Sequence, residues 1–489
     1  MTTIEAELSL LDALEQARLV REREATPSEL AQAALHRIAA TDGELNSVVI
    51  DMAEEALRRA AGPLPSGPLS GVPTLLKDLG GAYAGAPRTE GSALLAGYVD
   101  EADCELVRRY KAAGLVMLGR TNTPEFGNAA TTEPRRYGPC RNPWDPARST
   151  GGSSGGAAAA VAAGIVPIAH GSDGGGSIRI PASCCGVVGL KPTRGRVSLA
   201  PDDDEMLCGF GVEHVLARTV RDSAAALDAE AGPAPGDPYF PPQPEHSFLS
   251  EVGAPPGRLR VAVATETWHG APLHPDCAAA VQDAAELLET LGHHVVAAAP
   301  VLDAEALLGA FGTVWTAATA WNLAAWEAAL GRTAGPDDVE DVTRMLAAEG
   351  RRISATAYLD ARAALGEQTR RIGRFFTQCD VALTATLHRL PADIGAGRAP
   401  ASAAQFFADD AAYCGTTYLA NMTGQPAISL PLHWNADGLP IGVQLTGRYA
   451  CEAVLLRLAA QLEEARPWAN CIPPIHASRV RELSRVRAT

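Results

Sequence analysis

The sequence of 489 residues lacks several features that would place it in a common functional class. It has no run of about 18 uninterrupted apolar residues, which is the length a helix needs to span a membrane. Its start, MTTIEAELSLLDALEQ, is acidic and amphipathic, without the basic and apolar regions of a signal peptide. The ten cysteines are scattered, with no C-x-x-C pair and no Cys/His cluster at zinc spacing. We therefore expect a cytoplasmic protein with reduced cysteines and no metal ion.

Positive charge is also scarce, since 41 Lys and Arg residues face 57 Asp and Glu residues, for a formal net charge of −16. This balance disfavours binding to nucleic acid, and we see no basic patch. Residues 202–205 are four consecutive acidic residues, which without other ligands are typical of a solvated loop rather than a metal site. Hydrophobic residues make up 47% of the chain, enough for an ample core. We expect a small molecule as the partner, with no organic cofactor.

Two clusters of glycine and serine stand in residues 148–192, at positions 151–156 (GGSSGG) and 174–177 (GGGS). Glycines before a serine allow positive φ and bring several N–H groups to one point, which would hold an anion. A phosphate loop would need Lys-Ser or Lys-Thr after its last glycine, and the dinucleotide G-x-G-x-x-G spacing is also missing. A flexible linker does not fit the apolar sequence on both sides. The pattern favours a nucleophilic serine beneath backbone donors.

A lysine upstream offers the base that such a serine needs. Residues 72–76 form an apolar strand pattern that ends at Lys77, and Asp78 follows. A lysine at a strand end is normally solvated, but the apolar neighbours here predict burial. Burial disfavours the ammonium form and lowers the pKa. A neutral lysine would accept a proton without any histidine.

Together, these motifs resemble those of the amidase signature enzymes. The hallmarks of that family are GGSSGG, a D-x-G-G-S-I-R-x-P run and an upstream apolar-Lys-Asp segment. Here they contain Ser153, Ser177 and Lys77, and the two serines are 24 residues apart. The resemblance covers about residues 25–470 and is sharpest over 71–196. The segments TNTPEFGN, TTEP, RIPAS and GVVGLKPTRGR are similar to the branch that holds nylon-oligomer (6-aminohexanoate cyclic dimer) hydrolases and carbamate-cleaving amidases.

The alternation of strand and helix patterns predicts an α/β fold, a large sheet flanked by helices. The expected helices cover residues 3–22, 26–40, 217–231 and 402–420, and expected strands include 165–169. The second helix has a start signal in Thr26, Pro27 and Glu29. The resemblance implies the amidase signature fold, a large mixed twisted β-sheet with many α-helices, as a single domain over 1–489 with a catalytic core at about 71–196.

The resemblance also implies a role for each motif residue. Ser177 would attack the substrate carbonyl, and Ser153, after a cis peptide bond, would link Ser177 to Lys77. The oxyanion hole would consist of the backbone N–H groups of Gly174, Gly175, Gly176 and Ser177. Supporting roles fall to Ser154, Asp173 and Arg179. Relatives usually carry a side chain at the position of Gly174, so we expect the backbone role to remain in a more flexible loop.

The expected activity is hydrolysis of small amides, and also of carbamates, aryl amides and esters, through an acyl-enzyme. The resemblance gives substrate-contact candidates in variable regions: Asn128, Thr131, Trp315 and Thr316. One alternative is the glutaminase subunit of a glutamine-dependent tRNA amidotransferase, which shares these motifs. Another is a non-catalytic binding relative, which the intact Lys77, Ser153 and Ser177 disfavour. The sequence is compatible with a monomer or a homodimer.

Overall fold

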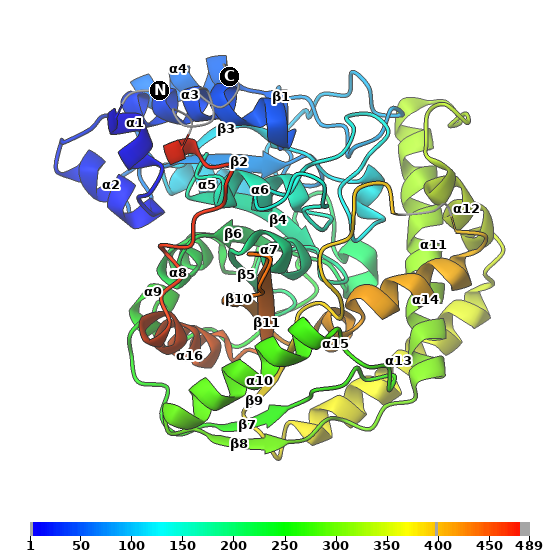
Figure 1. The fold of residues 1–489 in the computed structure, drawn as a ribbon. Coiled ribbons are helices and arrows are strands. Elements are labelled where there is room, and N and C mark those ends of the chain that lie inside the picture. Colours follow the sequence, from blue (N-terminus) through cyan, green and yellow to red (C-terminus); the bar gives the residue numbers. More distant parts are fainter. Residues whose placement is uncertain (1–2, 397–399, 480–489) are drawn as a thin grey trace.

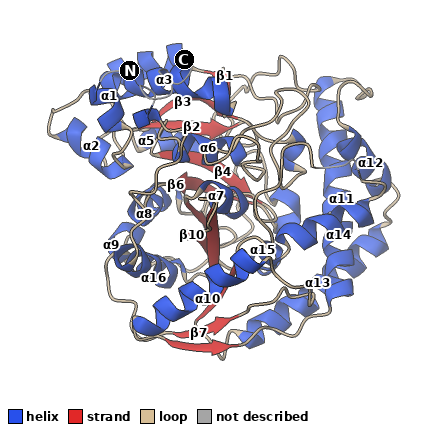
Figure 2. Cartoon of the chain, viewed as in Figure 1, coloured by secondary structure: helices blue, strands red, loops and turns tan. Residues whose placement is uncertain are grey.

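The computed structural model describes residues 3–396 and 400–479 as two neighbouring β-sheets with helices around them (Figures 1 and 2). This mixed α/β architecture confirms the predicted fold class. Two buried apolar clusters fill the space between sheets and helices. No helix within these described ranges is both long enough and apolar enough to cross a membrane.

The larger sheet has eight strands in the order β4-β6-β5-β10-β11-β9-β7-β8. Its pairs are antiparallel from β4 to β9 and parallel from β9 to β8, so the sheet is mixed. The strands are β4 Ile168–Asp173, β5 Val188–Lys191, β6 Val212–Ala217, β7 Arg260–Val263, β8 His294–Ala297, β9 Val381–Ala385, β10 Ala427–Trp434 and β11 Pro440–Gly447.

The smaller sheet has the order β1-β3-β2 and lies beside β4 of the larger one. Its strands are β1 Val48–Asp51, β2 Pro73–Lys77 and β3 Val116–Thr121. The Thr74 hydroxyl donates to the Ile168 carbonyl at 3.0 Å, and the Lys77 amide donates to His170 Nδ1 at 3.1 Å. These two bonds join β2 to β4, so the carboxyl ends of both strands meet where the two sheets adjoin.

The N-terminal helices are α1 Thr3–Leu8, α2 Ala13–Arg21, α3 Pro27–Leu45 and α4 Ala53–Ala61. The capping box predicted at Thr26 and Glu29 is confirmed, although the helix continues to Leu45. The single helix predicted over residues 3–22 is wrong. Asp12 caps the start of α2, and the Asp222 carboxylate accepts the amides of Ala13 and Leu14, so the chain turns between two helices.

The remaining helices cover the larger sheet and extend beyond it. Helices α8, α10 and α16 pack on its strands, whereas α11 to α13 form an outer layer at the right of Figure 1. Their bounds are α5 Glu105–Ala112, α6 Gly155–Ala162, α7 Arg179–Cys185, α8 Val220–Glu230, α9 Phe248–Glu251, α10 Pro275–Thr290, α11 Ala304–Leu330, α12 Asp341–Gly350, α13 Ala355–Phe375, α14 Ala403–Cys414, α15 Thr416–Thr423 and α16 Glu452–Ala465. Three short 3₁₀ helices are η1 Glu125–Gly127, η2 Met206–Gly209 and η3 Ala477–Arg479.

Two strands differ from the sequence-based expectation because they carry buried polar residues. Strand β4 runs to Asp173 rather than ending at residue 169, and β6 was not predicted. In β6, the buried His214 bonds to Glu230 and to Ser223, so a polar pattern typical of a loop is satisfied inside the protein. The helix predicted over 402–420 is likewise divided into α14 and α15 at Gly415.

Candidate active site

The structure brings Lys77 and Ser153 together, 76 residues apart in the chain. Lys77 Nζ lies 2.7 Å from Ser153 Oγ and 2.9 Å from Ser172 Oγ. Lys77 is the last residue of β2, Ser172 belongs to β4, and Ser153 precedes α6. Ser172 was not singled out from the sequence, because only the pairing of β2 with β4 places it there. The amine is thus held between two hydroxyl groups.

The Lys77 side chain is completely buried, and burial lowers its pKa to about 7. The carboxylates of Asp173, Glu213 and Glu90 act in the opposite direction, since each favours the ammonium form. Near neutral pH the amine is therefore partly unprotonated. A neutral amine can accept a proton from one serine while donating to the other.

The peptide bond between Gly152 and Ser153 is cis, as the family resemblance implied. Gly152 also packs closely against Thr131, because a Cβ added at Gly152 would be 2.6 Å from the Thr131 carbonyl oxygen. Ser154, the next residue, donates its amide to the Ser177 carbonyl at 3.1 Å. Its hydroxyl accepts the Ser172 amide and donates to the Ser172 carbonyl, both at 3.2 Å. Both glycine-serine clusters are thereby connected.

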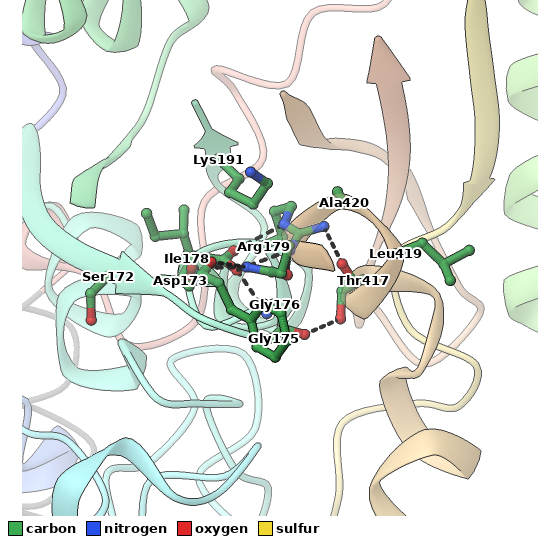
Figure 3. A network of polar contacts seen from close by, with 12 residues as sticks. Ser172, Asp173, Gly175, Gly176, Ile178, Arg179, Lys191, Thr417, Leu419 and Ala420 are labelled. Atoms are coloured by element: carbon green, nitrogen blue, oxygen red, sulfur yellow. Dashed lines mark hydrogen bonds and ion pairs between the residues drawn. The ribbon is translucent and has the colours of Figure 1, made fainter. Parts of the chain in front are cut away.

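Asp173 and Arg179 form a buried ion pair beneath the second cluster (Figure 3). Arg179 Nε and Nη2 each lie 2.9 Å from an Asp173 carboxylate oxygen, and Arg179 also donates to Thr417, Gln444 and Asn421. Although burial opposes it, the Arg179 guanidinium lowers the pKa of Asp173 to about 2. The carboxylate therefore stays ionised and provides a fixed negative charge next to the loop.

This ion pair fixes the backbone that carries the four predicted oxyanion donors. The Gly176 amide donates to Asp173 Oδ1 at 2.8 Å, and the Thr417 hydroxyl donates to the Gly175 carbonyl (Figure 3). The peptide between Gly175 and Gly176 is thus held at both ends. Its N–H group is already engaged by a carboxylate, so Gly176 does not fit the predicted role. The amides of Gly174, Gly175 and Ser177 stay candidates.

Gly174 packs against Leu207 of the 3₁₀ helix η2. A Cβ added at Gly174 would lie 2.4 Å from Leu207 Cδ1, and the Trp315 ring is 3.6 Å from the same point. The place where a side chain would stand is therefore filled by Leu207. A side chain at this position would require the flexible end of Leu207 to move.

Ser177 lines a small pocket that is also lined by five aromatic side chains. The pocket also contains Asn128, which accepts a hydrogen bond from Trp315 Nε1 at 2.9 Å through its Oδ1 atom. Its Nδ2 group then stays as a donor beside the pocket. The lining residues are Gly127, Asn128, Ala129, Ala130, Gly175, Ser177, Ile180, Phe311, Trp315, Phe406, Phe407, Asp410 and Tyr418.

Of the four predicted substrate contacts, Asn128 and Trp315 line this pocket, whereas Thr131 and Thr316 do not. Thr316 follows Trp315 on α11, so it points about 100° away around the helix, and its carbonyl adjoins Gly350 of α12. Phe407, Asp410 and Tyr418 were missed because α14 and α15 reach the pocket only through tertiary packing. A larger cleft, lined in part by Asp12, Arg218 and Trp468, contains none of the predicted catalytic residues.

No group of three or more His, Cys, Asp or Glu side chains suited to hold a metal ion occurs within residues 3–396 and 400–479. All ten cysteines are free thiols, and most are buried. Burial raises the pKa of Cys184 to about 12, and Cys185 also has a raised pKa. These two thiols are therefore poor nucleophiles at neutral pH.

The chain is similar to several known proteins. A family model described as Amidase matches residues 29–456. The 6-aminohexanoate-cyclic-dimer hydrolase of Paenarthrobacter ureafaciens is 40% identical over 474 residues, covering 94% of this chain and 95% of the relative. A structure of 6-aminohexanoate cyclic dimer hydrolase complexed with substrate superimposes with a TM-score of 0.92 at 39% identity, covering 96% of this chain and 99% of the other.

Two further structures are similar at lower identity. A bacterial aryl acylamidase of the amidase signature family has a TM-score of 0.85 at 27% identity, with 94% of this chain and 97% of the other covered. A glutamyl-tRNA(Gln) amidotransferase subunit from Thermotoga maritima has a TM-score of 0.74 at 28% identity, with 96% and 98% covered. By TM-score, the amidotransferase subunit is less similar to this chain than the cyclic dimer hydrolase and the aryl acylamidase are.

Proposed function

Since the chain belongs to the amidase signature family and is an amidohydrolase, we propose that it cleaves small amides through Lys77, Ser153 and Ser177. The observation that carries the proposal is the buried Lys77 amine, 2.7 Å from Ser153 Oγ, with its pKa lowered to about 7. An amine in this state can act as a general base near neutral pH.

In the proposed reaction, Ser177 Oγ attacks the amide carbonyl carbon as its proton passes to Ser153. Ser153 in turn gives its own hydroxyl proton to Lys77 Nζ. The carbonyl oxygen becomes an oxyanion, held by backbone N–H groups of Gly174, Gly175 and Ser177; such donors typically contribute a few kcal/mol each. The C–N bond then breaks, and the proton on Lys77 returns through Ser153 to the leaving nitrogen. An acyl-enzyme on Ser177 remains.

Water completes the cycle by the same route. It gives a proton through Ser153 to Lys77 while its oxygen attacks the acyl carbon, and the proton then returns to Ser177 as the acid leaves. Ser172 would hold the Lys77 amine in place during both steps, as its hydroxyl lies 2.9 Å from Nζ. Asp173 and Arg179 would fix the backbone that carries the oxyanion donors.

For the substrate, we propose linear or cyclic amides, with carbamates, aryl amides and esters as further substrates. A carbamate presents the same carbonyl to the serine, and an ester is easier to cleave. The Nδ2 group of Asn128, which lines the same pocket as Ser177, would donate to the substrate. The similarities to an aryl acylamidase and to a 6-aminohexanoate cyclic dimer hydrolase support the amide part of this range. We place the enzyme in the cytoplasm, where free thiols are stable.

The test is product release, measured by mass spectrometry, from an aryl amide, its carbamate, its ester and glutamine. We expect cleavage of the amide, and complete loss of it in Ser177→Ala with the thermal unfolding unchanged. Full activity in that variant would contradict the role of Ser177. Cleavage of glutamine alone would favour the glutaminase subunit of a tRNA amidotransferase, and cleavage of nothing would favour a binding protein.

A further inference from the structure

A carboxyl group stands in the wall of the pocket that contains Ser177. Asp410 belongs to α14, lines this pocket and is partly exposed. The Tyr418 hydroxyl donates to Asp410 Oδ2. Tyr418 in turn lies beside the catalytic loop, because a Cβ added at Gly175 would be 3.3 Å from its ring. Asp410 is therefore connected to the reaction site through a single side chain.

The surroundings of Asp410 are aromatic rather than basic. The Phe311 ring is stacked on Tyr418 with centroids 4.4 Å apart, and Trp315 lies 5.6 Å from Phe311. Phe406 and Phe407 add two more rings to the pocket wall, 5.0 Å apart. In the part of the chain that the structure describes, no lysine, arginine or histidine forms an ion pair with Asp410. The adjacent Asp409 adds a like charge, and burial raises the pKa of Asp410 to about 7.

A carboxyl group without a cation is costly in an apolar pocket, so a bound cation would be stabilised there. Aromatic ring faces attract ammonium ions as well. The wall can therefore stabilise a primary ammonium group in two ways, through the Asp410 carboxylate and through the aromatic rings. An alkyl chain would suit the remaining lining, which includes Ile180 and Ala130.

We propose that Asp410 selects substrates that carry a primary ammonium group, joined by an alkyl spacer to the amide that Ser177 cleaves. This inference deepens the proposed function and rests on it for the position of the scissile bond. Tyr418 would hold the carboxylate by its hydrogen bond and would contribute one ring face to the ammonium. The substrate class is thus that of ω-amino amides.

The test compares kcat/KM for 6-aminohexanoyl anilide and heptanoyl anilide, which have the same chain length but differ in the terminal group. A second pair, N-(5-aminopentyl)benzamide and N-hexylbenzamide, places the amine on the leaving side. For one pair or both, we expect the wild type to prefer the ammonium substrate about tenfold or more, as one charge-assisted contact provides. Asp410→Asn should lose this preference while keeping activity on the neutral substrate.

The matched control is Asp409→Asn, on the same helix, whose exposed carboxylate accepts from Gln405. It should keep the preference. The proposal is overturned if the wild type shows no preference in either pair. It is also overturned if Asp410→Asn lowers turnover of both members of a pair equally, as a merely structural role would.

Binding measured by calorimetry tests the ammonium site independently of the proposed reaction. Hexylamine should bind to Ser177→Ala more tightly than 1-hexanol does, and the difference should disappear in the Ser177→Ala, Asp410→Asn double variant. If no amide is cleaved but this difference is found, the proposed reaction is wrong and the ammonium site stands. Equal binding of amine and alcohol would overturn the ammonium site itself.

Discussion

The catalytic loops and the pocket wall are built in different ways. The loops come from β2, β4 and the segments before α6 and α7, all within residues 71–185, and buried polar contacts fix them. The aromatic wall of the pocket comes from α11, α14 and α15, more than 100 residues later, and its rings pack against one another. The loops fix the proton path and the catalytic backbone, whereas the wall determines the shape of the pocket.

This difference separates reaction from selection. A proton relay needs atoms at hydrogen-bond distance, so one lost contact in the loops should affect every substrate. The wall contacts only the part of the substrate that fills it, so a change there should affect some substrates and spare others. The following predictions test this separation, from the largest expected effect to the smallest.

Replacement of Lys77 should have the largest effect. Lys77→Met keeps the buried volume but removes the base, so we expect kcat/KM to fall by about 10³-fold or more, as for other acid–base residues. Lys77→Ala should lose activity to a similar extent, and raising the pH should not restore the activity of either variant. The chain has three lysines, and Lys191 is also buried with its pKa lowered to about 7.

Lys191 provides the matched control, because its amine donates to the Pro192 carbonyl rather than to a serine. Lys191→Met should therefore keep most of the activity on every substrate. Equal losses in the Lys77 and Lys191 variants would show that burial of a lysine, rather than its contact with Ser153, is what matters.

Breaking the ion pair beneath the loop should lower both stability and activity. Asp173→Asn leaves the Arg179 guanidinium buried without its carboxylate, which costs about 3–5 kcal/mol in comparable cases. We expect a lower unfolding temperature by calorimetry and a fall in kcat for all substrates. As a control, Glu367→Gln removes an exposed i,i+4 pair with Arg371 and should change the unfolding temperature little. Similar unfolding temperatures in the two variants would contradict this account.

Activity should depend on the protonation of Lys77. The neutral amine is the active form, so kcat/KM on a neutral anilide should rise about tenfold per pH unit below the pKa of about 7 and level off above it. Glu213→Gln removes a carboxylate that favours the ammonium form, which should move the midpoint to lower pH. A profile that is flat from pH 5.5 to 8.5 would rule out Lys77 as the titrating base.

The smallest effect is expected in the pocket wall. Trp315→Phe removes the hydrogen bond from Nε1 to Asn128 Oδ1 and leaves the longer one, at 3.4 Å, from the Thr319 hydroxyl. We expect KM to rise roughly fivefold, equivalent to about 1 kcal/mol for one lost hydrogen bond, with kcat nearly unchanged. The size should vary between aryl and alkyl amides in steady-state assays. A uniform fall in kcat instead would place Trp315 with the loops.

The same contrast explains what could be predicted from the sequence. Lys77, Ser153 and Ser177 stand in local motifs. The structure joins Lys77 to Ser153, and the backbone of Ser154 to that of Ser177. Ser172 was missed although it is one residue from Asp173, because only the contact between β2 and β4 gives it a partner. Asp410 and Tyr418 belong to an ordinary amphipathic pattern in residues 403–423, and nothing local marks them as pocket residues.

One of the four predicted oxyanion donors, the Gly176 amide, is engaged by another group in the structure, for a related reason. A run of glycines predicts that several amides can converge, but it does not tell which amide is engaged by another group. Here the Asp173 carboxylate takes the Gly176 amide, and Asn421 of α15 supports that carboxylate from a distant part of the chain. Hydrogen-bond partners set by the tertiary fold decided this point.

Helix α15 belongs to both regions at once. Thr417 and Asn421 hold the catalytic loop, and Tyr418 stands between them in the wall of the pocket. A protein engineer who mutates this helix to alter substrate range would also disturb the chemistry, so most such variants should be lost. Among the described residues, no side chain of α11 or α14 donates a hydrogen bond to this loop, although Trp315 of α11 packs against Gly174 and Gly175. Libraries confined to their pocket-facing residues should therefore yield more active variants with new substrates, and natural divergence should follow the same route.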